Sequence, residues 1–338
     1  MKPVSYLIAC CATAALGLAL SSCGDSAAPE TAIGAKPASK SAVHQAAPGT
    51  ALKLAFITNN SSEFWKIAEK GVQKANAELN INVEMKLPET GKVEQQKKII
   101  EDLVSQGYNG FAISLISPAD ETRDIDKAGQ QLNVITHDSD GPQSKRLAYI
   151  GTNNFEAGKV LGEALKKAMP NGGKIAAFVG TLAADNAKQR LEGIKKAIAG
   201  SNLSVAVTKE DAKDMTKART NVEDVINANP DITALVGLWS YNTPSIVAAV
   251  VASKKTGLTV AGFDEEDGSL QGIADGVVSF TVVQKPFEFG YRSSKLLFEL
   301  CTKGEAALPA EPIIDTGVEV VTKDTVADFQ KRLADLKK

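Results

Sequence analysis

The chain has 338 residues, 43% of them hydrophobic and 23% charged, which is the composition of a globular protein long enough for about two domains. Lysine and arginine total 38 against 40 aspartate and glutamate residues. The formal net charge of -2 provides no field that would attract nucleic acid, so no nucleic-acid partner is expected. With four cysteines and only two histidines, His44 and His137, we expect no metal site, no cofactor and no Ser-His-Asp chemistry.

An export signal is predicted at the N-terminus. Lys2 precedes an apolar run, residues 6–20, that is too short for a comfortable transmembrane helix but fits the hydrophobic region of a signal peptide. The run ends in Leu20-Ser21-Ser22-Cys23, which resembles the bacterial lipobox, whose cysteine is lipidated before cleavage. We therefore expect residues 1–22 to be a lipoprotein signal peptide and Cys23 to be anchored to a membrane, in the periplasm or at the outer cell surface. An ordinary signal peptide or a membrane anchor is the alternative.

A flexible tether is predicted to follow the cysteine, so that residues 23–50 form one unit. Ala, Gly, Pro, Ser and Thr dominate this stretch, and Ile33 and Val43 are its only large aliphatic residues. Such a composition buries too little apolar surface to offset the entropy of ordering. As a coil the tether would reach on the order of 30 Å. His44 falls within it and is therefore not considered a site residue.

Residues 51–338 alternate between short β-branched runs and helical stretches. The stretch from Phe64 to Leu79 shows the helical pattern, with apolar residues three or four positions apart. Alternating strands and helices with short connections predict the α/β class, with parallel sheets covered by helices on both faces. Strands are expected at residues 52–58, 81–87, 110–115, 132–136, 147–150, 174–179, 203–208, 232–238, 258–263 and 277–283.

A strand pattern that occurs twice indicates two similar domains. Residues 132–138 and 258–264 share a leucine, a valine two positions later, and an aromatic residue followed by aspartate. In doubly wound sheets, ligands bind at the carboxyl ends of the strands, so Asp138 and Asp264 would lie on opposite walls of one cleft. Capping of the following helix explains each aspartate equally well.

Other motifs lack the spacing that their chemistry needs. Residues 151–159 separate two glycines by six residues where a phosphate loop needs four. His137 has no second histidine outside the tether with which to bind a metal. Asp211 and Asp214 lack the glycine turn and distal glutamate of a calcium loop. Because no nucleophile, base and orienting group can be named together, we expect a binding protein and not an enzyme.

The residues available for binding suit a neutral sugar. Sugar rings stack on aromatic side chains through their C–H faces, while carboxylates, amides and arginine hold their hydroxyls. Such side chains follow predicted strands or begin predicted helices at Phe64, Trp65, Asp138, Arg190, Trp239, Asp264 and Gln284. Phe64 lies on the apolar stripe of its helix, so core packing explains it as well, whereas Trp65 is about 100° off that stripe.

Six short stretches follow one family's pattern: residues 61–65 (SSEFW), 116–120 (ISPAD), 134–139 (VITHDS), 187–193 (AKQRLEG), 260–264 (VAGFD) and 280–284 (FTVVQ). Through them the chain resembles, from Leu52 to about Val321, the ribose-type, cluster B periplasmic sugar-binding proteins of ABC transporters. The resemblance implies two doubly wound domains of the type I periplasmic binding protein fold, joined by three crossing segments and closing on a monosaccharide. The expected first lobe is residues 51–152 with 285–312, and the second is residues 153–284 with 313–338.

The family motifs also imply roles for the site residues. Phe64 and Trp65 would sandwich the sugar ring, and Asp138 would bind two hydroxyls. Ser62 and Ser117 would lie near further hydroxyls. The residues expected to bind from the second lobe and the hinge are Arg190, Asp264 and Gln284.

Several positions depart from the ribose-binding pattern. Ser62 stands where ribose binders carry asparagine, Ser139 stands where they carry arginine, and Trp239 or Ser240 stands near a second asparagine. A buried polar site rejects a sugar whose hydroxyls leave its groups unpaired, so ribose is not the expected ligand. Arg190 is the only cationic group predicted in the cleft. Because a single cation is predicted, a neutral ligand is favoured over an anionic one.

The predicted function is that of a monomeric substrate-binding lipoprotein of an ABC-type sugar importer. It would capture a neutral monosaccharide or polyol by hinge closure and deliver it to a membrane permease. The alternative is a receptor of the same fold that feeds a chemoreceptor or sensor kinase, which this sequence does not distinguish. A third interpretation, an enzyme acting on sugars, would require two carboxylates about 5 to 9 Å apart across a scissile bond.

Overall fold

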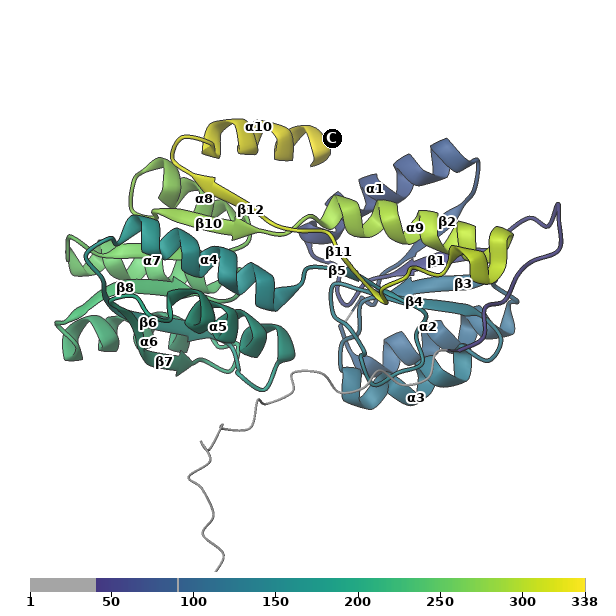
Figure 1. Cartoon of the computed structure of the whole chain (residues 1–338), viewed down its shortest axis with the longest axis horizontal. Helices are drawn as coiled ribbons and strands as arrows, with labels where there is room; N and C mark the ends of the chain where they lie inside the picture. Colours follow the sequence, from purple (N-terminus) through teal and green to yellow (C-terminus); the bar gives the residue numbers. More distant parts are fainter. Residues whose placement is uncertain (1–40, 90, 338) are drawn as a thin grey trace, which may run out of the picture. The chain divides into compact units, whose positions relative to one another are not determined.

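The computed structural model describes residues 41–89 and 91–337. The predicted signal peptide, Cys23 and most of the predicted tether lie outside the described residues. In the described part of the chain, strands and helices alternate and the strands form two six-stranded sheets (Figure 1). The predicted α/β class with two parallel-sheet domains is confirmed.

The first lobe is built on a parallel sheet with strand order β11-β5-β4-β3-β1-β2. Helices α1 (Glu63–Leu79) and α9 (Pro286–Lys303) cover one face, and α2 (Val93–Ser105) and α3 (Pro118–Ala128) cover the other. A 3-10 turn, η1 (Gly304–Ala307), follows α9. The strands are β1 (Leu54–Ile57), β2 (Val83–Lys86), β3 (Gly110–Ile113), β4 (Asn133–His137), β5 (Tyr149–Gly151) and β11 (Ile313–Asp315).

The second lobe repeats this arrangement with strand order β12-β10-β9-β8-β6-β7, in which only β12 is antiparallel to its neighbour. Helices α4 and α5 cover one face, and α6, α7, α8 and α10 cover the other. The strands are β6 (Gly173–Val179), β7 (Leu203–Glu210), β8 (Ile232–Gly237), β9 (Thr259–Phe263), β10 (Phe280–Val283) and β12 (Glu319–Thr322). The helices are α4 (Asn154–Ala168), α5 (Asp185–Ile198), α6 (Met215–Ala228), α7 (Asn242–Ser253), α8 (Asp267–Ala274) and α10 (Val326–Lys337).

Burial on both faces of the first sheet explains why strand β1 is apolar at every position. In β1, Leu54 and Phe56 pack under α1 and α9, while Ala55 and Ile57 pack under α2 and α3. All four side chains are fully buried. Because successive residues of a strand point to opposite faces, a strand between two helical layers needs an uninterrupted apolar run.

Each lobe contains one helix pair that packs through glycines. In α4, a Cβ added to Gly158 would lie 2.1 Å from the carbonyl oxygen of Arg190 in α5. In α9, a Cβ added to Gly290 would lie 2.0 Å from the carbonyl oxygen of Ala68 in α1. Real Cβ contacts are never this short, so any larger residue at either position would force the two helices apart.

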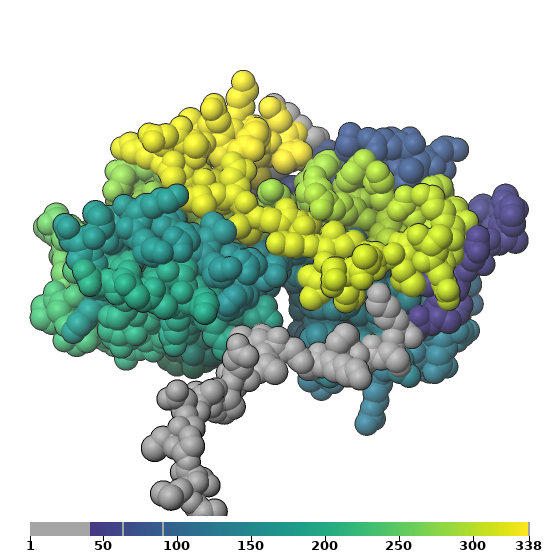
Figure 2. Space-filling model, viewed as in Figure 1, coloured from purple at the N-terminus to yellow at the C-terminus, as the bar shows by residue number. Residues whose placement is uncertain are grey.

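The C-terminal segment supplies an edge strand to both sheets and lies at the surface (Figure 2, yellow). The predicted boundary after residue 312 is therefore wrong in one detail. Residues 313–315 form β11 and pair with β5 in the first sheet, and the chain crosses to the second sheet only at residues 316–318. The other two crossings are at residues 152–153 and 284–285.

The end of the predicted tether, residues 41–50, is packed against the first lobe, and we call it the N-terminal strap. The Ser41 amide donates to the carbonyl of Lys145 at 2.9 Å, and the Ala46 amide donates to that of Cys301 at 2.8 Å. Val43 packs against the core under α9. The expectation of a flexible tether up to residue 50 is thus wrong for residues 41–46, because backbone pairing and one apolar contact offset the ordering entropy.

His44 is part of the same contact with the first lobe. Its backbone amide donates to Asn133 Oδ1 at 2.8 Å, and its Nε2 lies 3.0 Å from the carbonyl oxygen of Gly129. Beneath the strap, Asn133 Nδ2 donates to the buried Cys301 Sγ at 3.3 Å. Burial raises the pKa of the Cys301 thiol. Both residues therefore make contacts within the first lobe.

Candidate functional site

The two strand-end aspartates occupy equivalent places in the two sheets. Asp138 directly follows β4 and Asp264 directly follows β9. Both adopt left-handed backbone conformations, with φ of 54° and 67°. Non-glycine residues in this region are uncommon and cluster where the surrounding structure holds a functional group in place. The repeated sequence pattern thus corresponds to a repeated local geometry.

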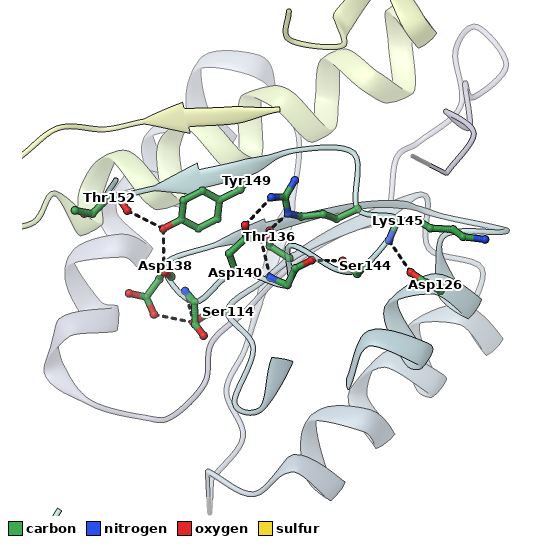
Figure 3. A network of polar contacts seen from close by, with 12 residues as sticks. Ser114, Asp126, Thr136, Asp138, Asp140, Ser144, Lys145, Tyr149 and Thr152 are labelled. Atoms are coloured by element: carbon green, nitrogen blue, oxygen red, sulfur yellow. Dashed lines mark hydrogen bonds and ion pairs between the residues drawn. The ribbon is translucent and has the colours of Figure 1, made fainter. Parts of the chain in front are cut away.

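In the first lobe, polar groups from the ends of neighbouring strands hold the Asp138 carboxylate. Ser114 Oγ donates to Asp138 Oδ2 at 2.8 Å, and Asn59 Nδ2 donates to the same oxygen at 3.3 Å (Figure 3 shows the Ser114 contact). The Tyr149 hydroxyl donates to the Asp138 carbonyl at 3.0 Å (Figure 3). Among the described residues, none donates a hydrogen bond to Asp138 Oδ1. One carboxylate oxygen is therefore fixed and the other is available to a ligand.

Burial raises the pKa of Asp138 to about 6. The hydrogen bond from Ser114 and the positive charge of Arg190 lower the pKa, whereas the negative charge of Asp264 raises it further. Arg190 and Asp264 belong to the second lobe, so charges of the second lobe influence the ionisation of this first-lobe carboxylate.

In the second lobe, Arg190 and Asp264 form a buried polar centre. Arg190 is only 3% exposed, and its Nη1 lies 3.8 Å from Asp264 Oδ2. Arg190 Nε donates to Asn154 Oδ1 at 2.9 Å, and Nη1 donates to the carbonyl of Leu238 at 2.8 Å. Burial lowers the pKa of Arg190, while the charges of Asp264 and Asp138 oppose this shift. Gln284, on a crossing segment, donates from Nε2 to Asp264 Oδ1 at 2.9 Å.

Two aromatic residues lie beside this centre. Trp239 directly follows Leu238, whose carbonyl receives the Arg190 bond, and its indole Nε1 donates to Asn186 Oδ1 at 3.1 Å. The ring of Tyr241 lies edge-on to the indole with centroids 6.3 Å apart. Both side chains are half-buried. They offer a partly exposed apolar surface next to Arg190.

The predicted orientation of the first-lobe aromatic residues is wrong. Trp65 is 2% exposed and packs edge-on against Phe56 and His137, whereas Phe64 is the partly exposed residue of the pair. Helix α1 is covered by both the first sheet and α9, and its buried stripe begins at Trp65 and continues with Ala68. The predicted apolar stripe through Ala68, Val72 and Ala75 is buried, and only in the first turn is Trp65, and not Phe64, the buried residue.

The three predicted serines lie at the edges of the site. Ser62 is exposed and precedes α1. Ser117 precedes α3, with its Oγ donating to Asp120 Oδ2 at 2.7 Å. Ser139 follows Asp138, and its amide lies 3.4 Å from Ser114 Oγ. The contribution of each serine to ligand binding stays a prediction.

Sequence reasoning missed Asn59, Ser114, Asn154 and Tyr241, although three of them had a readable signal. Asn59 and Ser114 follow β1 and β3, and Tyr241 lies in the loop after β8. Asp138 was predicted because ligands bind at the carboxyl ends of parallel strands. The same rule applies to these three positions. Asn154 begins a helix and is recognisable only through its contact with Arg190.

The described residues include neither a metal-binding cluster nor a helix able to span a membrane. Residues 41–89 and 91–337 hold no group of three or more His, Cys, Asp or Glu side chains arranged to bind a metal ion. Over the same range, no helix combines the length and apolarity needed to cross a bilayer. The polar groups at the two sheet ends are donors and acceptors suited to hydroxyl groups.

Two doubly wound lobes, three crossings and a polar centre at the facing strand ends define a two-lobe substrate-binding protein. Residues 54–306 match the model of the family described as periplasmic binding protein domain, and the chain belongs to this family. The expected ribose-type relationship is confirmed, and the chain is of the class that binds sugars for ABC importers. This class comprises binding proteins rather than enzymes.

Three relatives show the range of this similarity. The xylose/arabinose-binding protein XylF of Sulfolobus acidocaldarius is 25% identical over 82% of this chain and 72% of its own length. An ABC transporter solute-binding protein of Burkholderia graminis, solved with D-arabinose, is 30% identical over 81% of this chain and 96% of that one, with a TM-score of 0.73. The arabinose-binding protein AraP of Geobacillus stearothermophilus is 27% identical, and the match covers 83% of this chain and 99% of that one, with a TM-score of 0.75.

Proposed function

We propose that the chain binds a neutral aldopentose between its lobes and presents the closed form to the permease of an ABC importer. The observation that carries the proposal is the pair of strand-end carboxylates, Asp138 and Asp264, with Arg190 3.8 Å from Asp264 and its charge lowering the pKa of Asp138. The runner-up, a receptor that passes the closed form to a sensor kinase, would use the same site.

The charge of the site supports an uncharged ligand. Two carboxylates and one guanidinium leave an excess negative charge, which would repel an anionic sugar. Arg190 uses Nε and Nη1 on protein acceptors, which leaves Nη2 to donate to a ligand. Asp138 Oδ1 is left to accept. Sugar hydroxyls, which donate and accept at once, match both groups.

The choice of a pentose rests on the relatives and on the departures from the ribose pattern. The three relatives described above carry names or ligands that refer to arabinose or xylose. Ser62 and Ser139 replace residues that ribose binders use, and Trp239 with Tyr241 adds apolar surface beside Arg190. A ring face of a pentose can stack on this surface while its hydroxyls reach Asp138 and Asp264.

Closure would follow from the division of the site between the lobes. A ligand held only by Asp138, or only by Arg190 and Asp264, loses part of its hydrogen bonds in an open form. Its higher affinity for the closed form shifts the population toward closure. The crossings at residues 152–153, 284–285 and 316–318 are the segments able to absorb this movement.

We further propose that the chain is a lipoprotein that does not transform its ligand. The lipobox-like residues 20–23 support lipidation of Cys23. The family match supports release of the sugar unchanged, because this family comprises substrate-binding proteins. Labelling with a fatty acid in cells, lost on Cys23→Ser substitution, tests the anchor.

Calorimetric titration of the mature protein tests the ligand. We expect D-arabinose or D-xylose to bind at least about tenfold more tightly than D-glucuronate, whose carboxylate would meet the negative site. Binding of the uronate alone would contradict a neutral ligand. Cross-linking of the sugar-bound protein in its own membranes identifies the partner, and recovery of a sensor kinase without a permease would replace the importer role.

The pH dependence of affinity provides a further prediction. An ionised Asp138 accepts sugar hydroxyls best, so we expect affinity to be constant above the pKa of about 6 and to fall as the pH drops below it. The free protein should show the opposite trend, because ionising a carboxyl whose folded pKa is raised lowers stability as the pH rises from about 4 to 6. Titrations between pH 5 and pH 8 check this, and the Asp138→Asn variant should lack the pH dependence.

A further inference from the structure

The indole of Trp239 is held from three directions. Its Nε1 donates to Asn186 Oδ1 at 3.1 Å. A Cβ added to Gly180 would lie 2.0 Å from the indole Cζ3, so the ring occupies the space that a side chain at position 180 would need. Tyr241 packs edge-on against the ring. The indole therefore lies directly over the carboxyl end of β6 in one orientation.

Tyr241 is itself fixed by a buried carboxylate. Its hydroxyl donates to Asp211 Oδ1 at 2.5 Å, and Asn242 Nδ2 donates to Asp211 Oδ2 at 3.0 Å. Asp211 is 1% exposed. Because both carboxylate oxygens are used within the protein, Asp211 is not a ligand group. We call Trp239 and Tyr241, held in this way, the aromatic corner.

One face of α5 positions both the aromatic corner and the buried cation. Asn186 and Arg190 are four residues apart on this helix and therefore lie on the same face. Asn186 holds the indole of Trp239, and Arg190 Nη1 donates to the carbonyl of Leu238, the preceding residue. The separation between the indole and the guanidinium is thus set by one turn of helix.

We propose that Asn186 is a positioning residue that determines sugar specificity. By holding the indole over Gly180, it closes the space beside Arg190 that the exocyclic hydroxymethyl group of a hexose would occupy. A pentose lacks this group and fits. The inference rests on the proposed function, since it concerns the same sugar site, and it identifies what selects pentoses over hexoses.

D-xylose and D-glucose test the inference because they differ only by the hydroxymethyl group. The wild-type protein should prefer xylose by about tenfold or more. In Asn186→Ala the indole is released, and the affinity ratio of xylose to glucose should fall by about fivefold or more. Asn186→Asp keeps the oxygen acceptor and should retain the wild-type ratio. Lys188→Ala, at an exposed position of α5, is the matched control.

A spectroscopic measurement separates ring position from binding. The chain has two tryptophans, so 5-fluorotryptophan labelling gives two resonances, and Trp65→Phe assigns them. Asn186→Ala should shift the Trp239 resonance in the sugar-free protein, and Asn186→Asp should not. Gly180→Ala, which displaces the ring by direct contact, should shift the same resonance and lower the same ratio even if Asn186→Ala folds poorly.

Each outcome bears on one conclusion. A wild-type protein that binds neither D-xylose nor D-arabinose overturns the proposed function, and this inference with it. If only D-arabinose binds, the same ratio is measured between D-arabinose and L-galactose, which also differ only by the hydroxymethyl group. A wild-type protein that binds both sugars equally, or an Asn186→Ala variant whose ratio stays within about twofold of wild type, overturns the inference alone. A Trp239 resonance that is unchanged in Asn186→Ala shows that the bond does not position the ring and likewise overturns it.

Discussion

Replacing Asp138 with asparagine is expected to weaken sugar binding by about 30-fold without lowering the melting temperature. Hydrogen bonds to charged groups contribute about 1.5 to 3 kcal/mol each, and the free oxygen of Asp138 is placed to accept one or two from the ligand. Asparagine still accepts from Ser114 and Asn59. Burial raises the pKa of Asp138, so its ionised form is unfavourable in the free protein and its loss does not destabilise the fold.

Asp264→Asn should lower both affinity and stability, which distinguishes the two aspartates. Arg190 is buried with Asp264 as its adjacent counter-charge, and removing one partner of a buried pair leaves the other charge uncompensated. Calorimetry and thermal unfolding of both variants check the contrast, with Asp267→Asn at an exposed position of α8 as the control. Unchanged affinity in both site variants would exclude these carboxylates from the ligand site.

Gly158→Ala is expected to cost about 1 to 3 kcal/mol of unfolding free energy and to weaken sugar binding as well. The new Cβ would lie 2.1 Å from the carbonyl oxygen of Arg190, so α4 and α5 must separate. The displaced α5 carries Arg190 and Asn186, and both lose their fixed distance to the residues at the end of β8.

Urea unfolding and calorimetry of the same samples test this expectation. Lys167→Ala, on the exposed face of α4, should change stability by no more than about 0.5 kcal/mol. A Gly158→Ala variant with wild-type stability would show that the helices separate at no cost. Wild-type affinity in a clearly destabilised variant would show that the position of α5 does not govern the site.

The sequence pattern predicts much of the fold because burial on both faces leaves a strong signal. Apolar strand runs, such as that of β1, and the repeated strand ending in Asp138 and Asp264 follow directly from the physics of parallel sheets. Helical phase is harder to predict. In α1, both Phe64 and Trp65 are aromatic. Trp65 is the buried one because it packs on Phe56 and His137 of the sheet, whereas Phe64 lies beside Phe289 of α9 and stays partly exposed.

Contacts between distant segments could not be predicted from local pattern. Asn186 is an ordinary polar residue on its helix until the loop after β8 brings Trp239 beside it. The N-terminal strap has the composition of a linker, yet it pairs with residues around Lys145 and Cys301. The segment of residues 313–315 is short, and two of its three residues are exposed. It is a strand because its backbone pairs with β5. In each case the partner, rather than the segment, determines the structure.

The N-terminal strap also decides which half of the molecule a membrane anchor would hold. If Cys23 carries lipid, the linker between the membrane and the folded protein comprises residues 24–40, and a chain of this length spans no more than about 60 Å at full extension. It joins the protein at Ser41, on the first lobe beside Lys145. The first lobe would then stay near the membrane, and on sugar binding the second lobe would move toward it.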